Sequence, residues 1–272
     1  MDASKDFADP TLYLEMCFKH QNVYKAIKDF ALVSVHDFFT QSHNLTSSKE
    51  QPLKVLDYGC GPVLAYGISA ARRKGVELVL AEYAEVYRDA VQQWLDHHPS
   101  AWDWTPYIKY VVQDLEGKDE MEVLKREESL RKAIKAVVLC DITSDPPIAK
   151  DFEGPYDVVM SMLCIENGCL TQEEYKTAIK RISTLVKRGG NLLLYSSVRN
   201  RGASDQTPGY YYVGKIRYIQ VALPLQFVQT TLKDNGFEII KTNMLPEEES
   251  VAIYNCGLTD LETTAFIIAT KV

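Results

Sequence analysis

The chain has 272 residues, 46% of them apolar and 25% charged, so it can bury the core of a full α/β domain. Its net charge of −7 and isoelectric point near 5.4 argue against a nucleic-acid ligand, since phosphate backbones require a basic surface. No stretch approaches about 18 consecutive apolar residues and the N-terminus lacks an apolar signal core, so we expect a cytoplasmic protein without a membrane partner.

The first 50 residues precede the first expected strand. They have a helical pattern from about Leu14 to Phe39, followed by a polar linker over residues 41–51. An extension of this kind often forms a lid over a cofactor, and simple packing against the sheet is the alternative.

From residue 51 onward, apolar runs alternate with helical patterns, which indicates a parallel sheet covered on both faces. The expected strands are 53–57, 76–82, 137–140, 156–162, 190–196, 237–243 and 263–270. The expected helices lie near 64–74, 85–97, 120–136, 171–187 and 223–235, with Gly189 and Gly236 capping the last two. The last two strands leave no room for a crossover helix, so we expect them to be antiparallel.

The whole chain, 1–272, is interpreted as one domain. It consists of the helical lid, 1–50, and a core, 51–272, with inserts near 99–136 and 199–222. The six cysteines show no CxxC spacing and mostly lie in apolar runs, so we expect reduced thiols, no disulfide and no metal site.

The most informative motif follows the first strand, where Asp57 precedes a turn that contains Gly59 and Gly61. Glu82 ends the second strand, where a carboxylate can bind ribose hydroxyls. Leu64 stands where a dinucleotide site needs a third glycine, and no Lys-Ser/Thr pair is present to hold a triphosphate. The charge of Asp57 repels phosphates but suits an ammonium or sulfonium group. The motif therefore predicts S-adenosylmethionine as cofactor, and the alternative is a turn that only tightens the strand–helix connection.

Further strings of residues suggest a family. They are Ala101–Pro106, Asp114–Gly117, Leu130–Ile142, Leu163–Glu166, Gly189–Gly190 and Tyr211–Gly214. In order and spacing they resemble the small-molecule N-methyltransferases that act on nicotinamide, phenylethanolamine, indolethylamine and thioethers. The similarity runs from about Tyr13 to Lys271. It implies the class I methyltransferase (Rossmann-like) α/β fold: a seven-stranded sheet with an antiparallel C-terminal hairpin and a helical N-terminal lid.

The resemblance also implies a set of cofactor-binding residues. They are Tyr13, Asp57, Gly59, Gly61, Glu82, Tyr83, Tyr87, Asp141, Ile142 and Leu163. The two glycines pass beside the methionine moiety, Glu82 binds the ribose, Tyr83 and Asp141 with Ile142 lie at the adenine, and Tyr13 closes the lid. The chain departs from the pattern at three places: Ala65 with Tyr66 one position later, Phe18 for a second lid tyrosine, and Tyr87 for an asparagine.

The substrate end diverges more. Ser196 replaces an aspartate that reads the carboxamide in the nicotinamide enzyme. A buried amide group that lacks its hydrogen-bond acceptor costs about 1–3 kcal/mol, so nicotinamide is disfavoured. Glu166 matches an acid near the substrate nitrogen, where it can favour a cation and accept a proton through water; a surface-loop glutamate is the alternative. Tyr212 and Asp260 complete the expected substrate contacts, and the loop from Arg199 to Pro208 shapes the pocket.

The predicted function is methyl transfer from S-adenosylmethionine to the nitrogen of a small amine or aza-aromatic compound. The sulfonium methyl group is already activated, so no catalytic nucleophile is expected. Transfer to the sulfur or selenium of a thioether or selenoether remains open, as does a catalytically silent cofactor-binding protein. We expect a monomer.

Overall fold

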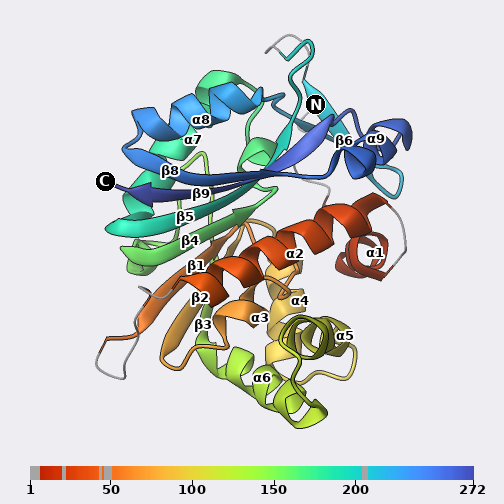
Figure 1. Cartoon of the computed structure of the whole chain (residues 1–272), viewed down its shortest axis with the longest axis vertical. Helices are drawn as coiled ribbons and strands as arrows, with labels where there is room; N and C mark the ends of the chain where they lie inside the picture. Colours follow the sequence, from red (N-terminus) through yellow and green to blue (C-terminus); the bar gives the residue numbers. More distant parts are fainter. Residues whose placement is uncertain (1–6, 20–22, 43–44, 46–50, 204–207) are drawn as a thin grey trace.

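The centre of the molecule is a seven-stranded sheet (Figure 1), seen in a computed structural model that describes residues 7–19, 23–42, 45, 51–203 and 208–272. Its strand order is β3-β2-β1-β4-β5-β9-β8. The strands are β1 Leu53–Tyr58, β2 Val76–Glu82, β3 Ile134–Leu139, β4 Tyr156–Met162, β5 Val186–Val198, β8 Phe237–Met244 and β9 Thr263–Lys271. The first five run parallel, and β9 is antiparallel to both of its neighbours.

The seven expected strands and the antiparallel pair are confirmed, but some details were wrong. A helix, α9 (Glu247–Asn255), does fit into the connection between β8 and β9. The helix expected over 64–74 is only the short α3, Gly67–Ala70. Gly189 does not cap a helix: it lies within β5 with φ +77°, where the pairing with β4 is irregular. Gly236, also at φ +77°, does follow its helix as expected.

Helices cover both faces of the sheet (Figure 1). One face carries α2 Val23–Gln41, α3, α4 Glu85–Leu95, α5 Thr105–Lys109, the π-helical turn η2 Tyr110–Leu115 and α6 Glu120–Ala133. The other carries α7 Gln172–Leu185 and α8 Leu225–Asp234. The alternation along β5 follows from the two-residue strand period, since Leu193 faces the α2 side and Leu194 the α7 side.

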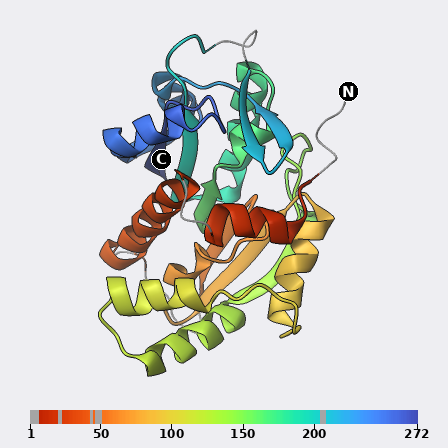
Figure 2. The same cartoon turned by 90° about the vertical axis from the view of Figure 1, so that its right-hand side faces the viewer.

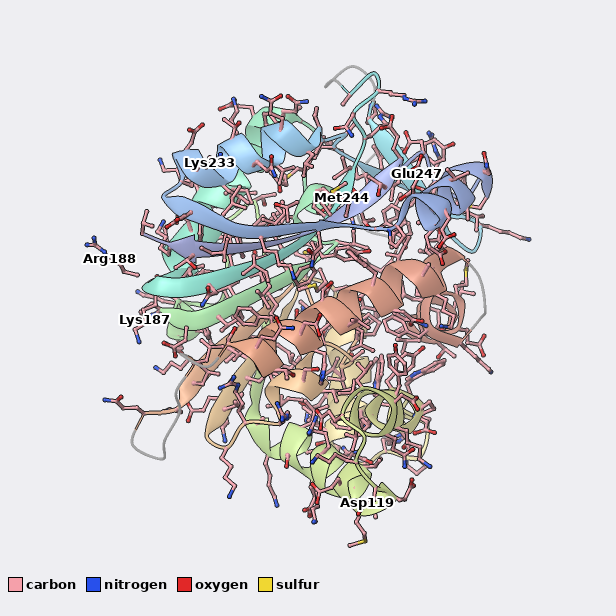
Figure 3. The ribbon with its side chains drawn as sticks, viewed as in Figure 1. Asp119, Lys187, Arg188, Lys233, Met244 and Glu247 are labelled. Atoms are coloured by element: carbon pink, nitrogen blue, oxygen red, sulfur yellow. The ribbon has the colours of Figure 1, made fainter. Side chains whose placement is uncertain are left out.

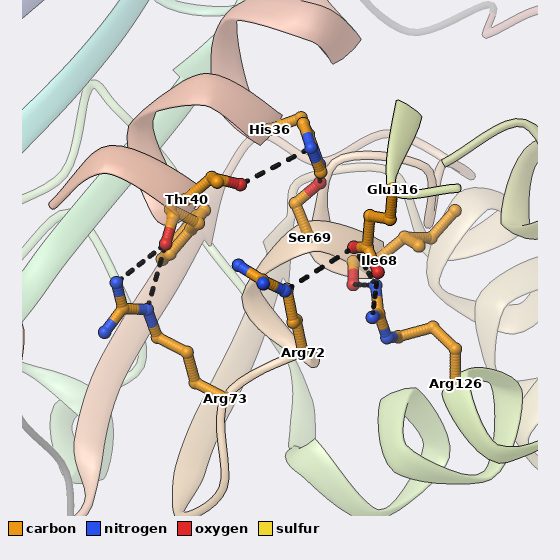
Figure 4. A network of polar contacts seen from close by, with 9 residues as sticks. His36, Thr40, Ile68, Ser69, Arg72, Arg73, Glu116 and Arg126 are labelled. Atoms are coloured by element: carbon orange, nitrogen blue, oxygen red, sulfur yellow. Dashed lines mark hydrogen bonds and ion pairs between the residues drawn. The ribbon is translucent and has the colours of Figure 1, made fainter. Parts of the chain in front are cut away.

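Helix α2 is fixed to the core by polar contacts at its C-terminal half (Figure 4). Arg73 donates to the backbone carbonyls of Phe39, Ser42 and Leu45, and so satisfies carbonyls that the helix end leaves free. His36 lies 3.3 Å from the hydroxyl of Ser69. These contacts make α2 a rigid part of the molecule rather than a mobile extension.

Two accessory elements cover the carboxyl edge of the sheet (Figure 2). One is the segment of residues 7–19, called here the lid segment, which contains α1 (Pro10–Leu14) and the π-helical turn η1 (Glu15–Lys19). Asp9 starts α1 by accepting hydrogen bonds from the next free N–H groups. The other is a hairpin that the sequence did not predict, β6 (Gly209–Val213) and β7 (Ile216–Gln220). It lies within the expected 199–222 insert and contacts the lid segment directly.

Charged side chains gather at the opposite, amino edge, where Lys187, Arg188 and Lys233 point outward (Figure 3). Over the described residues, no helix has both the length and the apolar character needed to cross a bilayer. The same part of the chain holds no cluster of three or more acidic, histidine or cysteine side chains placed to bind a metal ion. The six cysteines are free.

Candidate active site

The glycine turn lies where β1 and β4 end side by side, at the point where the strand order reverses. Gly59 and Gly61 have φ values of +71° and +62°, which side chains rarely adopt. A Cβ atom on Gly59 would also lie 1.8 Å from the sulfur of Cys164, which follows β4. Leu163, between that cysteine and the end of β4, is itself held at φ +51°. Ligands of open α/β sheets bind in the crevice at this position.

Two carboxylates lie beside the turn. Asp57 is fully buried, and neither of its oxygens has a hydrogen-bond partner among the described residues. Burial, followed by the nearby charge of Glu82, raises the pKa of Asp57 to about 7. Glu82 accepts hydrogen bonds from the N–H groups of Gly61 and Ala84, both at 2.8 Å, and burial raises its pKa as well. The arrangement favours a ligand that brings positive charge to Asp57.

A groove of about 1060 Å³ continues from Glu82 along the ends of β2 and β3. Tyr83, Leu139 and Asp141 line it, and Tyr83 is 48% exposed at its mouth. The carboxylate of Asp141 accepts hydrogen bonds from the N–H and hydroxyl of Thr143 and from the hydroxyl of Ser144; although burial opposes them, these bonds lower its pKa. Asp141 therefore stays ionised in the groove. Ile142 does not line the groove but packs on Gly168.

Aromatic rings from the lid segment and α4 meet above the turn. The ring centroid of Tyr13 lies 5.6 Å from that of Tyr87, which lies 5.7 Å from that of Phe7. Tyr211 of the hairpin stacks on Tyr218 at 5.0 Å. Burial, with the nearby Cys17 thiol and Tyr211 hydroxyl, raises the pKa of Tyr13, which stays protonated as a hydrogen-bond donor.

Glu166 is not a surface-loop residue, because it is fully buried in a short 3₁₀ turn, η4 (Ile165–Gly168). Its Oε1 accepts a hydrogen bond of 2.7 Å from the N–H of Ser197, while its Oε2 has no partner in the part of the chain that the structure describes. Burial raises the pKa of Glu166, and the Ser197 N–H opposes this shift. A buried carboxylate with one free oxygen is suited to binding a cation or taking up a proton.

The other expected substrate residues, unlike Glu166, have their polar or ring contacts with neighbouring residues of the chain. Ser196 is buried, and its hydroxyl donates to the carbonyl of Ser197. Tyr212 packs its ring on Tyr210 at 5.8 Å, on the hairpin face away from Tyr211. Asp260 accepts from the N–H of Tyr210 at 2.7 Å and forms an ion pair with Arg199.

Sequence reasoning missed several residues of this region. Phe7, Tyr211 and Tyr218 were not singled out as site residues, although the run of tyrosines after Gly209 was a visible signal. Tyr66 was noted only as a displaced match to the family pattern, but it is buried. Burial raises its pKa most, and Asp57 and Cys17 are among the neighbouring groups that raise it further.

The fold and this edge of the sheet together define a class I S-adenosylmethionine-dependent methyltransferase. The magnesium protoporphyrin IX methyltransferase of Synechocystis PCC 6803, solved with bound SAH, has the same fold. It superimposes with a TM-score of 0.58 at 17% identity, over 97% of this chain and 94% of its own.

More specifically, the model of the NNMT/PNMT/TEMT family matches residues 1–272, and the chain belongs to this family. Human nicotinamide N-methyltransferase is 28% identical over 74% of this chain and 72% of its own length. Indolethylamine N-methyltransferase of Oryctolagus cuniculus is 27% identical over 80% of this chain and 76% of its own. The chain is thus an S-adenosylmethionine-dependent methyltransferase, as its glycine turn predicted.

Proposed function

We propose that this enzyme transfers the methyl group to the nitrogen of a small aromatic amine that binds as a cation. The observation that carries the proposal is Glu166, buried with one oxygen free of hydrogen bonds. An uncompensated buried carboxylate is costly unless a partner brings positive charge or a proton. A protonated amine supplies both. The tyrosines of the hairpin and the lid segment add flat apolar surfaces that suit an aromatic ring.

The described residues fit the cofactor. The unpaired carboxylate of Asp57 suits its positive charge, and a side chain at Gly59 would collide with Cys164 where backbone must come close to the ligand. We assign the ribose to Glu82, the adenine to the groove beside Tyr83 and Asp141, and the outer wall to Tyr13 and Tyr87. Leu163 and Ile142 support this edge from β4 and from beneath Gly168. S-adenosylmethionine supplies an activated methyl group when bound.

The chain's own contribution is to hold the acceptor in line, exclude water and move one proton. An amine must lose a proton before its nitrogen can attack. Glu166 takes this proton at Oε2, directly or through water, and its raised pKa makes it a better base than an exposed glutamate.

Nicotinamide is a disfavoured acceptor in this proposal. Ser196, in place of the family's aspartate, is buried and directs its hydroxyl to the backbone of its neighbour. Asp260 is paired with Arg199 and is left out of the proposed amine site. Glu166 then provides the negative charge of the acceptor pocket, which favours arylalkylamines with one ammonium group over neutral carboxamides.

The test is methyl transfer from labelled S-adenosylmethionine to a panel of phenylethylamines, indolethylamines, pyridines and thioethers. We expect turnover of an arylalkylamine that falls about 100- to 10,000-fold in Glu166→Gln, the range of a lost general base. Glu173→Gln, at an exposed carboxylate on α7, is the matched control and should behave as wild type. Turnover of thioethers alone, or equal amine turnover by both variants, would overturn the proposal.

We further propose that the enzyme works as a cytoplasmic monomer on small molecules and not on nucleic acid. The supporting facts are its net charge of −7 and its isoelectric point near 5.4. Light scattering during size-exclusion chromatography tests the oligomeric state: a monomer should have a mass near 30.8 kDa.

A further inference from the structure

The backbone carbonyl of Phe18, near the end of η1, accepts two hydrogen bonds from side chains of other elements. The ammonium group of Lys28 in α2 donates to it at 3.2 Å, and the hydroxyl of Tyr107 in α5 donates to it as well. Lys28 also lies 2.9 Å from the Tyr107 hydroxyl. The last carbonyls of a helical turn have no partner within it, so these donors satisfy an otherwise free group. We call these three groups the latch.

The latch is buried, although it contains a charge. The side chain of Lys28 is only 7% exposed, and its ammonium group lies over the rings of Phe18 and Tyr107, at 5.4 and 5.0 Å from their centroids. Its nearest carboxylate, Asp29, is 3.9 Å away and pairs more closely with Lys25. A lysine is rarely buried without full pairing. The free-energy cost of burying the Lys28 ammonium group therefore depends on the Phe18 carbonyl and the two rings being in place.

The latch holds one end of the lid segment. The other end is held by the hairpin, where the hydroxyl of Tyr218 accepts from the N–H of Ala8 at 2.8 Å. Between them, Leu12 packs on Gly214, and Met16 accepts from the N–H of the same glycine. The lid segment thus spans from the hairpin to α5 across the edge where the cofactor site lies.

The base of the latch is rigid. The contacts of Arg73 and His36 fix α2 (Figure 4), and Tyr107 packs edge to face on Phe18, with Trp104 alongside. Movement of the lid segment must therefore break the hydrogen bonds at the Phe18 carbonyl. Breaking them leaves a buried ammonium group without its main acceptor, and that penalty opposes opening.

We propose that Lys28 and Tyr107 are positioning residues that hold the lid segment closed by gripping the carbonyl of Phe18, and so set how long the cofactor stays bound. The inference rests on the expected role of the N-terminal extension as a lid over the cofactor. The phenyl ring of Phe18 packs on Trp104 and Tyr107 of the 99–136 insert, and its backbone carbonyl is the point of attachment.

The test is the dissociation rate of labelled S-adenosylhomocysteine from the full-length enzyme, displaced by excess unlabelled ligand. Tyr107→Phe removes one hydroxyl and Lys28→Met removes the ammonium group but keeps the apolar stem. Each should speed release about three- to tenfold, the effect of losing one hydrogen bond, and the double variant should release less fast than the product of the two effects. Tyr110→Phe and Lys109→Met, which lie close to Tyr107 in the chain but outside the latch, are the controls and should release like wild type.

A purely structural role would lower the melting temperature without changing release. If the latch holds the lid segment closed, hydrogen exchange in the two latch variants should also become faster in peptides covering residues 8–19, and not in those from β4 and β5. Release unchanged in a folded Tyr107→Phe variant overturns the latch, even if Lys28→Met fails to fold. If release is unchanged in Tyr107→Phe but faster in Tyr13→Phe, the lid segment still covers the cofactor but the latch does not hold it. If release is unchanged in Tyr13→Phe as well, the interpretation of this segment as a lid is wrong. No acceptor is present in this assay, so an error in the proposed acceptor cannot affect it.

Discussion

The unpaired carboxylate of Asp57 should make the stability of the cofactor-free enzyme fall as the pH rises. Burial, with a smaller effect of Glu82, raises the pKa of Asp57 from 3.8 to about 7. Between these values the folded protein binds more protons than the unfolded chain, so the free energy of unfolding decreases with pH. The slope is at most about 1.4 kcal/mol per pH unit and becomes smaller near pH 7, so the loss between pH 5 and pH 7 is about 2 kcal/mol.

Asp57→Asn removes this titration. In urea unfolding without cofactor, the variant should gain about 2 kcal/mol on wild type between pH 5 and pH 7, and then change by less than about 0.5 kcal/mol to pH 8. Using the difference between the two proteins cancels the titration of buried acids that are not coupled to Asp57, such as Glu166. Asp151→Asn, at an exposed position, should follow wild type at every pH.

The same substitution should weaken cofactor binding, because wild type gains a positive partner for a carboxylate that already carries its burial cost. We expect at least a tenfold loss of affinity, or about 1.4 kcal/mol, by titration calorimetry at pH 8. A stability difference that stays constant within about 0.5 kcal/mol from pH 5 to pH 8 would refute the assigned pKa and the reasoning built on it.

Two further predictions concern the packing described above. Gly59→Ala should abolish measurable S-adenosylmethionine binding, because its methyl group would meet Cys164. Gly61→Ala, which has room for a Cβ atom, should cost only about 1–2 kcal/mol of backbone strain. Titration calorimetry on both variants checks this, and equal losses of cofactor affinity would contradict it. Arg126→Met should destabilise the fold by about 1–3 kcal/mol, because it removes two hydrogen bonds from the buried Glu116 and leaves it only the 3.8 Å ion pair with Arg72. Lys132→Met, from an exposed pair, should cost less than about 0.5 kcal/mol. Similar melting temperatures for the two variants would show the buried pair to be unimportant.

The local motifs of this chain could be predicted because their chemistry is contained in a few adjacent residues. Asp57 ends β1 just before the turn that holds the two glycines, and Glu82 ends the next strand, so the spacing alone predicts their meeting at one edge. Gly189 shows the limit of such rules. A glycine after a helix usually caps it, but here the pairing of β5 with β4 extends past it and places it in a bulge.

Other features depended on partners far away in the sequence. The pairing of Asp260 with Arg199 spans 61 residues, and no local pattern reveals it. The assignment of Tyr212 to the substrate contacts stays a prediction. Tyr210, Tyr211 and Tyr212 are consecutive, so the two-residue alternation of a strand cannot tell which ring faces the lid segment. Only the hairpin partner, Tyr218, decides this.

The hydrogen bond between Ala8 and Tyr218 joins residues 210 positions apart, and it has a consequence for biosynthesis. The lid segment leaves the ribosome about 200 residues before the hairpin that provides its docking surface. Contacts of such large separation form late in folding. The nascent enzyme should therefore gain its ability to retain the cofactor near the end of translation, and fragments that stop before residue 209 should fail to retain it.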